Sequence, residues 1–404
     1  MAFALLASII ANEQSTQTSP SSYQFVAFYV ALYAMGIGSA SSTPNIVSLG
    51  AGQFDSSSHK SVFVTLYIAS TNVGLLLATT CVSYVQNQGR WAIGFGMSAV
   101  AGLLSLLLVL FAILTIRDSR TNGVNPLVRI FHVVINIVFC ERFGLYDSTL
   151  EEVKEVKSVV RLLPFWVCGV LVCSVTAQKS TFFVLQGATM DNKIGPEFKL
   201  PSSSMGLFSF ISVVVGAPCY SWLIAPFIRK MRKKDLSPIE RMGIGLLMAI
   251  SSFLVAAIVE SQRLRIAHMR SVKYVGLKVV DDDDDDDDVV PMSIFWLVPQ
   301  YVLEGLTNVF FGCGNLDFNY TYAPVSMRSL ATAIFLSGMA LGNFGSTFIV
   351  QVVTSLTSWI SDDLNFGHLD CFYWLLDGIL LLTFALFLMF SKWHHTSLTP
   401  MELR

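Results

Sequence analysis

The chain has 404 residues, of which 53% are hydrophobic and only 13% are charged, and its formal net charge is −2. A soluble protein of this length needs more charged residues to cover its surface, so the composition indicates an integral membrane protein. The near-neutral charge gives no sign of a nucleic-acid partner.

Long apolar runs follow one another along the chain. A helix that crosses roughly 30 Å of hydrocarbon needs about 20 mainly apolar residues. We predict about nine such transmembrane helices and therefore an all-α membrane protein. They cover residues 24–45, 62–86, 91–116, 161–187, 205–228, 240–260, 293–316, 329–356 and 370–391. Residues 2–11 form a tenth apolar piece that is too short to span a bilayer.

The distribution of Lys and Arg predicts the orientation of these helices. Residues 229–241 are rich in both and are predicted to be cytoplasmic. Strict alternation places the basic segment 117–160 on the same side, and it places the loops 12–23 and 357–369, which lack Lys and Arg, outside. The segment 261–290 breaks the rule, because it is predicted to be an external loop and yet carries several basic residues.

Two polar segments are not predicted to span. Residues 125–140 mix Arg129 and His132 into an apolar run, which is typical of a helix lying on the cytoplasmic surface. Residues 281–288 are consecutive aspartates, predicted to form a disordered, self-repelling loop. This run lacks the turn glycine and the spaced oxygens of a calcium loop, and no cysteine pair has metal-ligand spacing, so no metal site is predicted.

Ionisable side chains inside membrane spans are costly and are therefore candidates for function. Lys179, Glu304, Asp317 and Asp377 occupy such positions. Glu304 and Asn308 are four residues apart and share one helical face. If this face lines a water-filled cavity, a carboxylate there can bind and release a proton as access alternates. The structural alternative is a polar contact between helices or a wet position near the interface.

Lys179 has three possible roles in this interpretation. It can pair with Glu304 or Asp317, attract an anionic substrate, or extend its ammonium to the membrane surface. Thr176 and Gln178 next to it, and an aromatic residue of the following polar span, Tyr301, complete the candidates for a substrate and proton pathway.

No motif of a soluble enzyme is present in the sequence. HExxH, a Walker A loop and G-x-S-x-G are all absent, so we predict that the protein is not an enzyme.

Six stretches carry a family resemblance. They are PNIVSLGAGQFD at 44–55, QKSTFFVLQGATMD at 178–191, ERMGIGL at 240–246, SIFWLVPQYVL at 293–303, YAPVSMRSLATAIFLSGMALGNF at 322–344 and HLDCFYWLLDGILLL at 368–382. In this order they resemble the plant branch of the proton-dependent oligopeptide transporter family, which includes peptide and nitrate carriers.

The resemblance implies a major facilitator-type helical bundle with two six-helix halves around a central site. The nine spans then correspond to family helices four to twelve. The expected domains are an incomplete N-terminal half at 1–116, a cytoplasmic central loop at 117–160, a complete C-terminal half at 161–391 and a cytoplasmic tail at 392–404.

The implied function is proton-coupled symport of a small solute, such as a di- or tripeptide, nitrate or another organic anion. The proton gradient is the expected driving force, without a cofactor, and the lipid bilayer, the solute and protons are the expected partners. The protein is expected in the plasma membrane or the vacuolar membrane.

Several family positions differ here. The E-x-x-E-R signature belongs to a first helix that this sequence does not contain, so we expect an N-terminally truncated member. Thr43 replaces the lysine that partners the signature, Gly52 replaces an acidic residue, and Asp317 replaces a glutamate of the tenth helix. Thr176 stands where nitrate carriers of this type use a histidine, which argues against that route. The alternative function is a transport-inactive partner of a complete relative.

Overall fold

The computed structural model describes residues 26–113 with gaps, residues 158–277 except 195–197, and residues 289–397 except 324–327 and 362–363. The gaps in the first part are 27–28, 31–32, 35, 39–44, 48, 55, 83–84 and 86–89. The predicted interfacial helix, the aspartate run and the short apolar piece at the start therefore lie outside the described residues. The chain divides into two compact units, Met1–Val124 and Asn125–Arg404.

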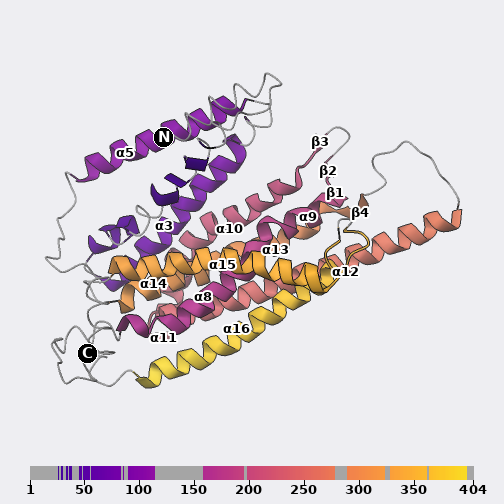
Figure 1. The fold of residues 1–404 in the computed structure, drawn as a ribbon. Helices are drawn as coiled ribbons and strands as arrows, with labels where there is room; N and C mark the ends of the chain where they lie inside the picture. The colour runs from indigo at the N-terminus through magenta and orange to yellow at the C-terminus, as the bar shows by residue number, and fades with distance from the viewer. Residues whose placement is uncertain are drawn as a thin grey trace. The chain divides into compact units, whose positions relative to one another are not determined.

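The first unit contains two long apolar helices, α3 (Ser57–Leu77) and α5 (Trp91–Ile113) (Figure 1). A π-helical turn, Ala78–Val82, extends α3. On α5 the side chains of Leu108 and Phe111 are both 68% exposed. Such a continuous apolar surface suits contact with lipid rather than water. The described residues between 26 and 52 are helical as well, within and beyond the predicted span 24–45.

The second unit is a bundle of helices that share one apolar core. Its helices are α8 (Leu163–Thr176), α9 (Phe182–Ala188), α10 (Gly206–Cys219), α11 (Ala225–Arg232), α12 (Pro238–Leu277), α13 (Val298–Thr307), α14 (Cys313–Tyr322), α15 (Arg328–Leu356) and α16 (Leu369–Ser397). α8 packs against α15 and α16, α12 packs against α13 and α16, and α10 packs against α13 (Figure 1). Large buried side chains, such as Phe165, Phe253 and Phe318, fill the core between them.

Two short strand pairs interrupt the otherwise helical fold. β1 (Met190–Asp191) pairs in parallel with β4 (Val290–Ser293), and β2 (Lys193–Ile194) pairs antiparallel with β3 (Phe198–Lys199). The pairing of β1 with β4 joins the end of α9 to the segment that leads into α13.

Seven helices in the described part of the chain are long and apolar enough to cross a membrane. They match the predicted spans 62–86, 91–116, 161–187, 205–228, 240–260, 329–356 and 370–391. The predicted span 293–316 is also helical, from Ile294 to Tyr322, but it is not one of the seven. Its many polar residues lower its hydropathy, and almost all of them are buried inside the unit. This polar helix carries most of the candidate site.

Proline and glycine shape the helices around that polar helix. Pro218 lies inside α10, where it removes a backbone hydrogen bond, and a π-helical turn follows at Tyr220–Ile224. Glycines allow very close helix contacts. A Cβ atom on Gly245 would lie 2.2 Å from the backbone nitrogen of Phe311, and one on Gly305 would lie 2.4 Å from the carbonyl oxygen of Ser209. Only a residue without a side chain fits at these crossings.

The structure corrects the predicted boundary of one span. α12 does not end near 260 but continues to Leu277, so half of the predicted external loop 261–290 is helix. With 40 residues it is roughly 60 Å long, about twice the hydrocarbon thickness. In Figure 1 its C-terminal end extends beyond α16. One basic residue of the segment that broke the charge rule, Arg263, is fully buried in this helix and is not a loop residue.

Candidate functional site

The polar centre of the second unit is an ion pair between Lys179 and Glu304. The ammonium group of Lys179 donates a hydrogen bond to Oε1 of Glu304, although the two residues are 125 positions apart. The side chain of Glu304 is 3% exposed, whereas that of Lys179 is 27% exposed. The carboxylate is therefore buried, while its cationic partner is partly exposed. Glu304 and Asp317 were both predicted as possible partners of Lys179, and in the structure Lys179 pairs with Glu304.

Two further side chains hold the Glu304 carboxylate. The hydroxyl of Ser209 on α10 donates to Oε2, and Nδ2 of Asn308 donates to Oε1 at 3.3 Å. Gly305 makes the first of these contacts possible, because its lack of a side chain lets α10 approach α13. Asn308 shares a helical face with Glu304, as the spacing of the two residues predicted. We call Lys179, Ser209, Glu304 and Asn308 the Glu304 cluster.

The two helical segments that supply Lys179, Glu304 and Asn308 are irregular at this level. Lys179 lies in a 3₁₀ turn, Ala177–Ser180, between α8 and α9. Asn308 begins a π-helical turn, Asn308–Gly312, between α13 and α14. Such local changes of helical pitch often mark functional or hinge positions, because the regular α-helical hydrogen bonds are replaced there by hydrogen bonds of a different spacing. Neither turn was predicted from the sequence.

Asp317 lies one helical segment further along, in α14. It is 6% exposed, and its Oδ1 accepts a hydrogen bond from the Thr321 hydroxyl at 3.2 Å. The neighbouring Gly314 lies close to α12, since a Cβ atom there would be 3.3 Å from Cγ of the buried Arg241. Nη2 of Arg241 donates to the carbonyl oxygen of Val309 at 2.8 Å. Asp317 thus lies on a helix, α14, that packs against α12.

The remaining predicted candidates have packing contacts in the structure. Gln178 is buried, and its amide donates to Ser346 Oγ at 2.7 Å, which joins the Lys179 turn to α15. The hydroxyl of Thr176 bonds within its own helix, to the carbonyl oxygen of Val172 at 3.0 Å. Tyr301 is buried, three residues before Glu304, and its ring meets Phe183 edge-on at 5.5 Å. Their roles in transport stay predictions.

Asp377, the fourth ionisable residue predicted inside a span, is 4% exposed on α16. Among the described residues its Oδ1 has no hydrogen-bond partner. The structure therefore does not bring Asp377 into the Glu304 cluster.

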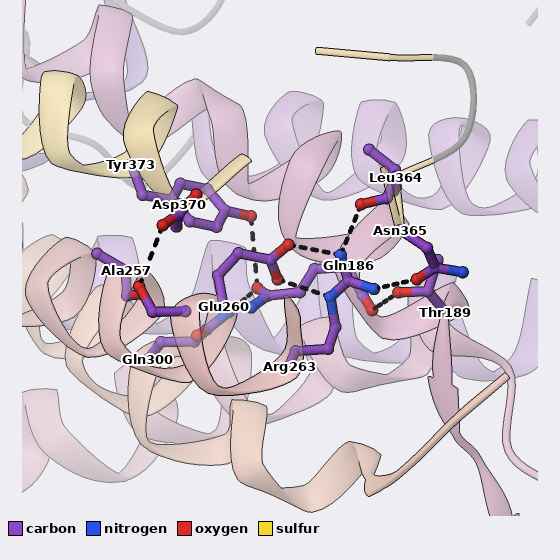
Figure 2. Close-up of polar contacts among 11 residues, drawn as sticks. Gln186, Thr189, Ala257, Glu260, Arg263, Gln300, Leu364, Asn365, Asp370 and Tyr373 are labelled. Atoms are coloured by element: carbon purple, nitrogen blue, oxygen red, sulfur yellow. Dashed lines mark hydrogen bonds and ion pairs between the residues drawn. The ribbon is translucent and has the colours of Figure 1, made fainter. Parts of the chain in front are cut away.

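A second buried ion pair was missed in the sequence. Glu260 and Arg263 lie three residues apart on α12, and both side chains are 0% exposed. Nε of Arg263 donates to Oε2 of Glu260 at 2.9 Å, and Nη2 donates to Oε1 at 2.7 Å (Figure 2). The spacing of three residues is a usual signal for such a pair. It was overlooked because Arg263 was assigned to a loop.

The guanidinium of Arg263 also fixes the segment that precedes α16. Nη1 donates to Oδ1 of Asn365 at 2.6 Å, and Nη2 donates to the carbonyl oxygen of Leu364 at 2.9 Å. Close by, Oε1 of Gln186 accepts from Nε2 of Gln300 at 3.1 Å and from the hydroxyl of Tyr373 at 3.4 Å (Figure 2). The polar network therefore joins α9, α12, α13 and α16 at one end of the unit.

No group of three or more His, Cys, Asp or Glu residues that could hold a metal ion occurs in the part of the chain that the structure describes.

Comparison with protein families identifies the chain. The profile PTR2, which describes the POT family, matches residues 3–144 and 133–365. The chain belongs to the POT family. The resemblance seen in the sequence is thereby confirmed, and the family membership favours a transporter over the transport-inactive alternative.

Arabidopsis thaliana has several similar proteins. NRT1/PTR FAMILY 8.1 is 33% identical over 92% of this chain and 75% of its own length. NRT1/PTR FAMILY 8.2 is 32% identical over 91% of this chain and 73% of its own length, and NRT1/PTR FAMILY 5.12 is 32% identical over 95% and 75%. The similarity to these plant relatives therefore runs along almost the whole of this chain.

Solved structures of the POT family share the fold. The in meso crystal structure of the transporter PepTSo matches with a TM-score of 0.61 over 98% of this chain and 83% of its own, at 17% identity. An auto-inhibited POT peptide transporter matches with a TM-score of 0.60 over 98% and 82%, at 15% identity. These matches confirm the predicted major facilitator-type helical bundle. The membrane-length helices and the family membership support a multi-pass membrane protein.

Proposed function

We propose that this POT-family protein is a proton-coupled symporter of a small solute and that the Glu304 cluster is its coupling element. The observation that carries the proposal is the contact of a nearly buried carboxylate, Glu304, with a partly exposed lysine, Lys179, from a different helix. The driving force is the proton gradient, no cofactor takes part, and the membrane is the plasma membrane or the vacuolar membrane.

The ion pair supplies two states. With Glu304 ionised, its charge holds Lys179, and Ser209 and Asn308 satisfy the remaining lone pairs. When a proton binds to Glu304, the attraction to Lys179 is lost, and the ammonium becomes available to an anionic group of the solute. Release of the solute then allows the pair to form again. Proton binding and solute binding are thus coupled, because each favours the state in which Lys179 and Glu304 are apart.

The chemistry of Lys179 favours a solute with a carboxylate or another anionic group. One POT transporter that is similar in fold is known in complex with 5-aminolevulinic acid. We propose the same broad class for this chain: small peptides and organic anions. Nitrate recognition through a histidine before Ala177 and Gln178 is not proposed, because Thr176 occupies that position.

Uptake by the full chain, expressed in a transport-deficient cell, tests the proposal. Uptake of at least one member of a panel of dipeptides, tripeptides and organic anions should rise as the outer pH falls. Glu304→Gln should reduce this proton-driven uptake by about tenfold or more, because an amide keeps the shape but carries no exchangeable charge. Exchange of solute across the membrane without a pH gradient should be retained.

Two further variants give this experiment its controls. Asp235→Asn changes an exposed carboxylate on the segment after α11 and should leave uptake unchanged. Asp317→Asn tests the other carboxylate of the polar helix, and unchanged uptake would remove that residue from the mechanism. Absence of pH-dependent uptake for every solute would overturn the function, and an unaltered pH profile in Glu304→Gln would overturn the role of the cluster.

A further inference from the structure

A surface cavity lies between the later part of α12 and the start of α16. Its volume is about 590 Å³, and Ser261, Arg265, His268 and Met269 of α12 line one side while His368 and Asp370 line the other. We call it the α12–α16 pocket. The pocket lies beside the Glu260–Arg263 pair, and Figure 2 draws Asp370 together with that pair. None of the residues that line the pocket belongs to the Glu304 cluster.

The charges of the α12–α16 pocket are mixed. Arg265, His268 and His368 are exposed and offer positive or hydrogen-bond donor groups. Asp370 supplies a carboxylate that is only partly satisfied. Its Oδ2 accepts a hydrogen bond from Ser261 at 3.4 Å, and the thiol of Cys371 lies near it. Oδ1 is buried and has no hydrogen-bond partner among the described residues. Because Asp370 also lines the pocket, its carboxylate favours a ligand with an N–H donor.

The pocket lies where the outer surface of the bundle changes from apolar to charged. On α12, Ile258 is 49% exposed and Arg265 follows about two turns later. On the antiparallel α16, Trp374 is 47% exposed and Asp370 precedes it by about one turn. The contact of Ser261 with Asp370 puts both changes at the same level. Such a boundary on adjacent membrane helices marks the headgroup region of the bilayer.

We propose that the α12–α16 pocket binds the headgroup of an aminophospholipid, with the ammonium on Asp370, the phosphate between Arg265 and His268, and the acyl chains along the apolar surface of α12 and α16. The ligand chemistry follows from complementarity, because a carboxylate and the donors that match a phosphate line the same pocket. A phosphatidylcholine headgroup has the same charges but no N–H group, so it cannot donate a hydrogen bond to the carboxylate of Asp370.

Lipid titration of the purified full chain in detergent tests this assignment. After removal of endogenous lipid, native mass spectrometry should show phosphatidylethanolamine binding about tenfold more tightly than phosphatidylcholine, the difference of one charge-assisted hydrogen bond. Soluble phosphoethanolamine, which lacks the acyl chains, should bind at least about tenfold more weakly than the lipid. Equal binding of both lipids would overturn the proposal, and so would equal binding of phosphoethanolamine.

Matched variants locate the site. Asp370→Asn should remove the preference for phosphatidylethanolamine, and Arg265→Gln, at an exposed position that tolerates the change, should weaken both lipids. Asp235→Asn and Arg229→Gln alter an exposed ion pair on α11 and the turn after it, and they should leave both affinities unchanged. Retained preference in Asp370→Asn together with unaltered affinity in Arg265→Gln would show that the lipid binds elsewhere and would overturn the proposal.

Discussion

Two ion pairs in the described part of the second unit, Glu260–Arg263 and Lys179–Glu304, differ in how completely each is enclosed. Glu260 and Arg263 belong to one helix, are 0% exposed, and make two direct hydrogen bonds to each other. Lys179 and Glu304 come from different helices, and the lysine is 27% exposed. The first pair is fixed by its own backbone, whereas the second depends on how two irregular helices are placed.

This difference separates a structural role from a functional one. A pair enclosed within one helix has little room to separate, and its further contacts to Leu364 and Asn365 hold a neighbouring segment in place. A pair between two helices with one partly exposed member can open when the helices shift. The Glu304 cluster is therefore suited to change state, and the Glu260–Arg263 pair is suited to keep the bundle intact.

The largest effect is expected at Arg263. Arg263→Ala leaves the carboxylate of Glu260 buried without its partner, which should lower the free energy of unfolding by about 3–5 kcal/mol. Denaturation of the purified protein in mixed detergent and SDS micelles measures the change. In the matched double variant, Glu260→Gln with Arg263→Met, no charge remains, and much of the loss should be recovered. A double variant as unstable as Arg263→Ala would contradict the ion-pair explanation.

The next effect concerns the helix contact beneath the Glu304 cluster. In Gly305→Ala the added methyl group meets Ser209 O, so α10 must move and the Ser209–Glu304 contact weakens. We expect a loss of about 1–3 kcal/mol in the free energy of unfolding. Gly206→Ala on α10 is the control, since its Cβ atom would meet nothing within 4 Å. Equal stability of the two variants would show that the crossing has room to relax.

A smaller effect on stability is expected at Lys179. Lys179→Met removes the cation, but Ser209 and Asn308 still donate to Glu304, so the free energy of unfolding should fall by about 1–2 kcal/mol. Proton-driven uptake should fall far more strongly, by about tenfold or more. The contrast between stability and uptake is the distinguishing result. A variant as destabilised as Arg263→Ala would mean that the two pairs do not differ in role.

The smallest effect is expected at an exposed pair. Arg229 and Asp235 form an ion pair at 2.6 Å, with side chains 53% and 52% exposed. Arg229→Gln should cause no measurable change in unfolding or in uptake, because water and salt screen such pairs. A clear loss of stability would show that the exposed fraction of the side chains does not by itself decide how much each of the three ion pairs contributes to stability.

Sequence reasoning reached the candidate site only in part. Lys179, Glu304 and Asn308 were recognised because charged and amide groups within apolar runs are conspicuous. Gln178 and Thr176 were named as pathway candidates because they lie near Lys179, and in the structure they bond to Ser346 and Val172. Ser209 was overlooked, since a serine in an apolar helix has no distinguishing signal until the opposite helix is known.

The sequence by itself determined the membrane class, the position of most spans and the family, because apolar length, charge distribution and ordered motifs are local properties of the chain. Only the tertiary structure decided which carboxylate Lys179 meets, and that α12 continues to Leu277 with Arg263 buried inside the bundle. The physical reason is that a charged residue marks a loop only when its charge faces water. Burial of Arg263 against Glu260 depends on helices distant in sequence, and no local pattern encodes their approach.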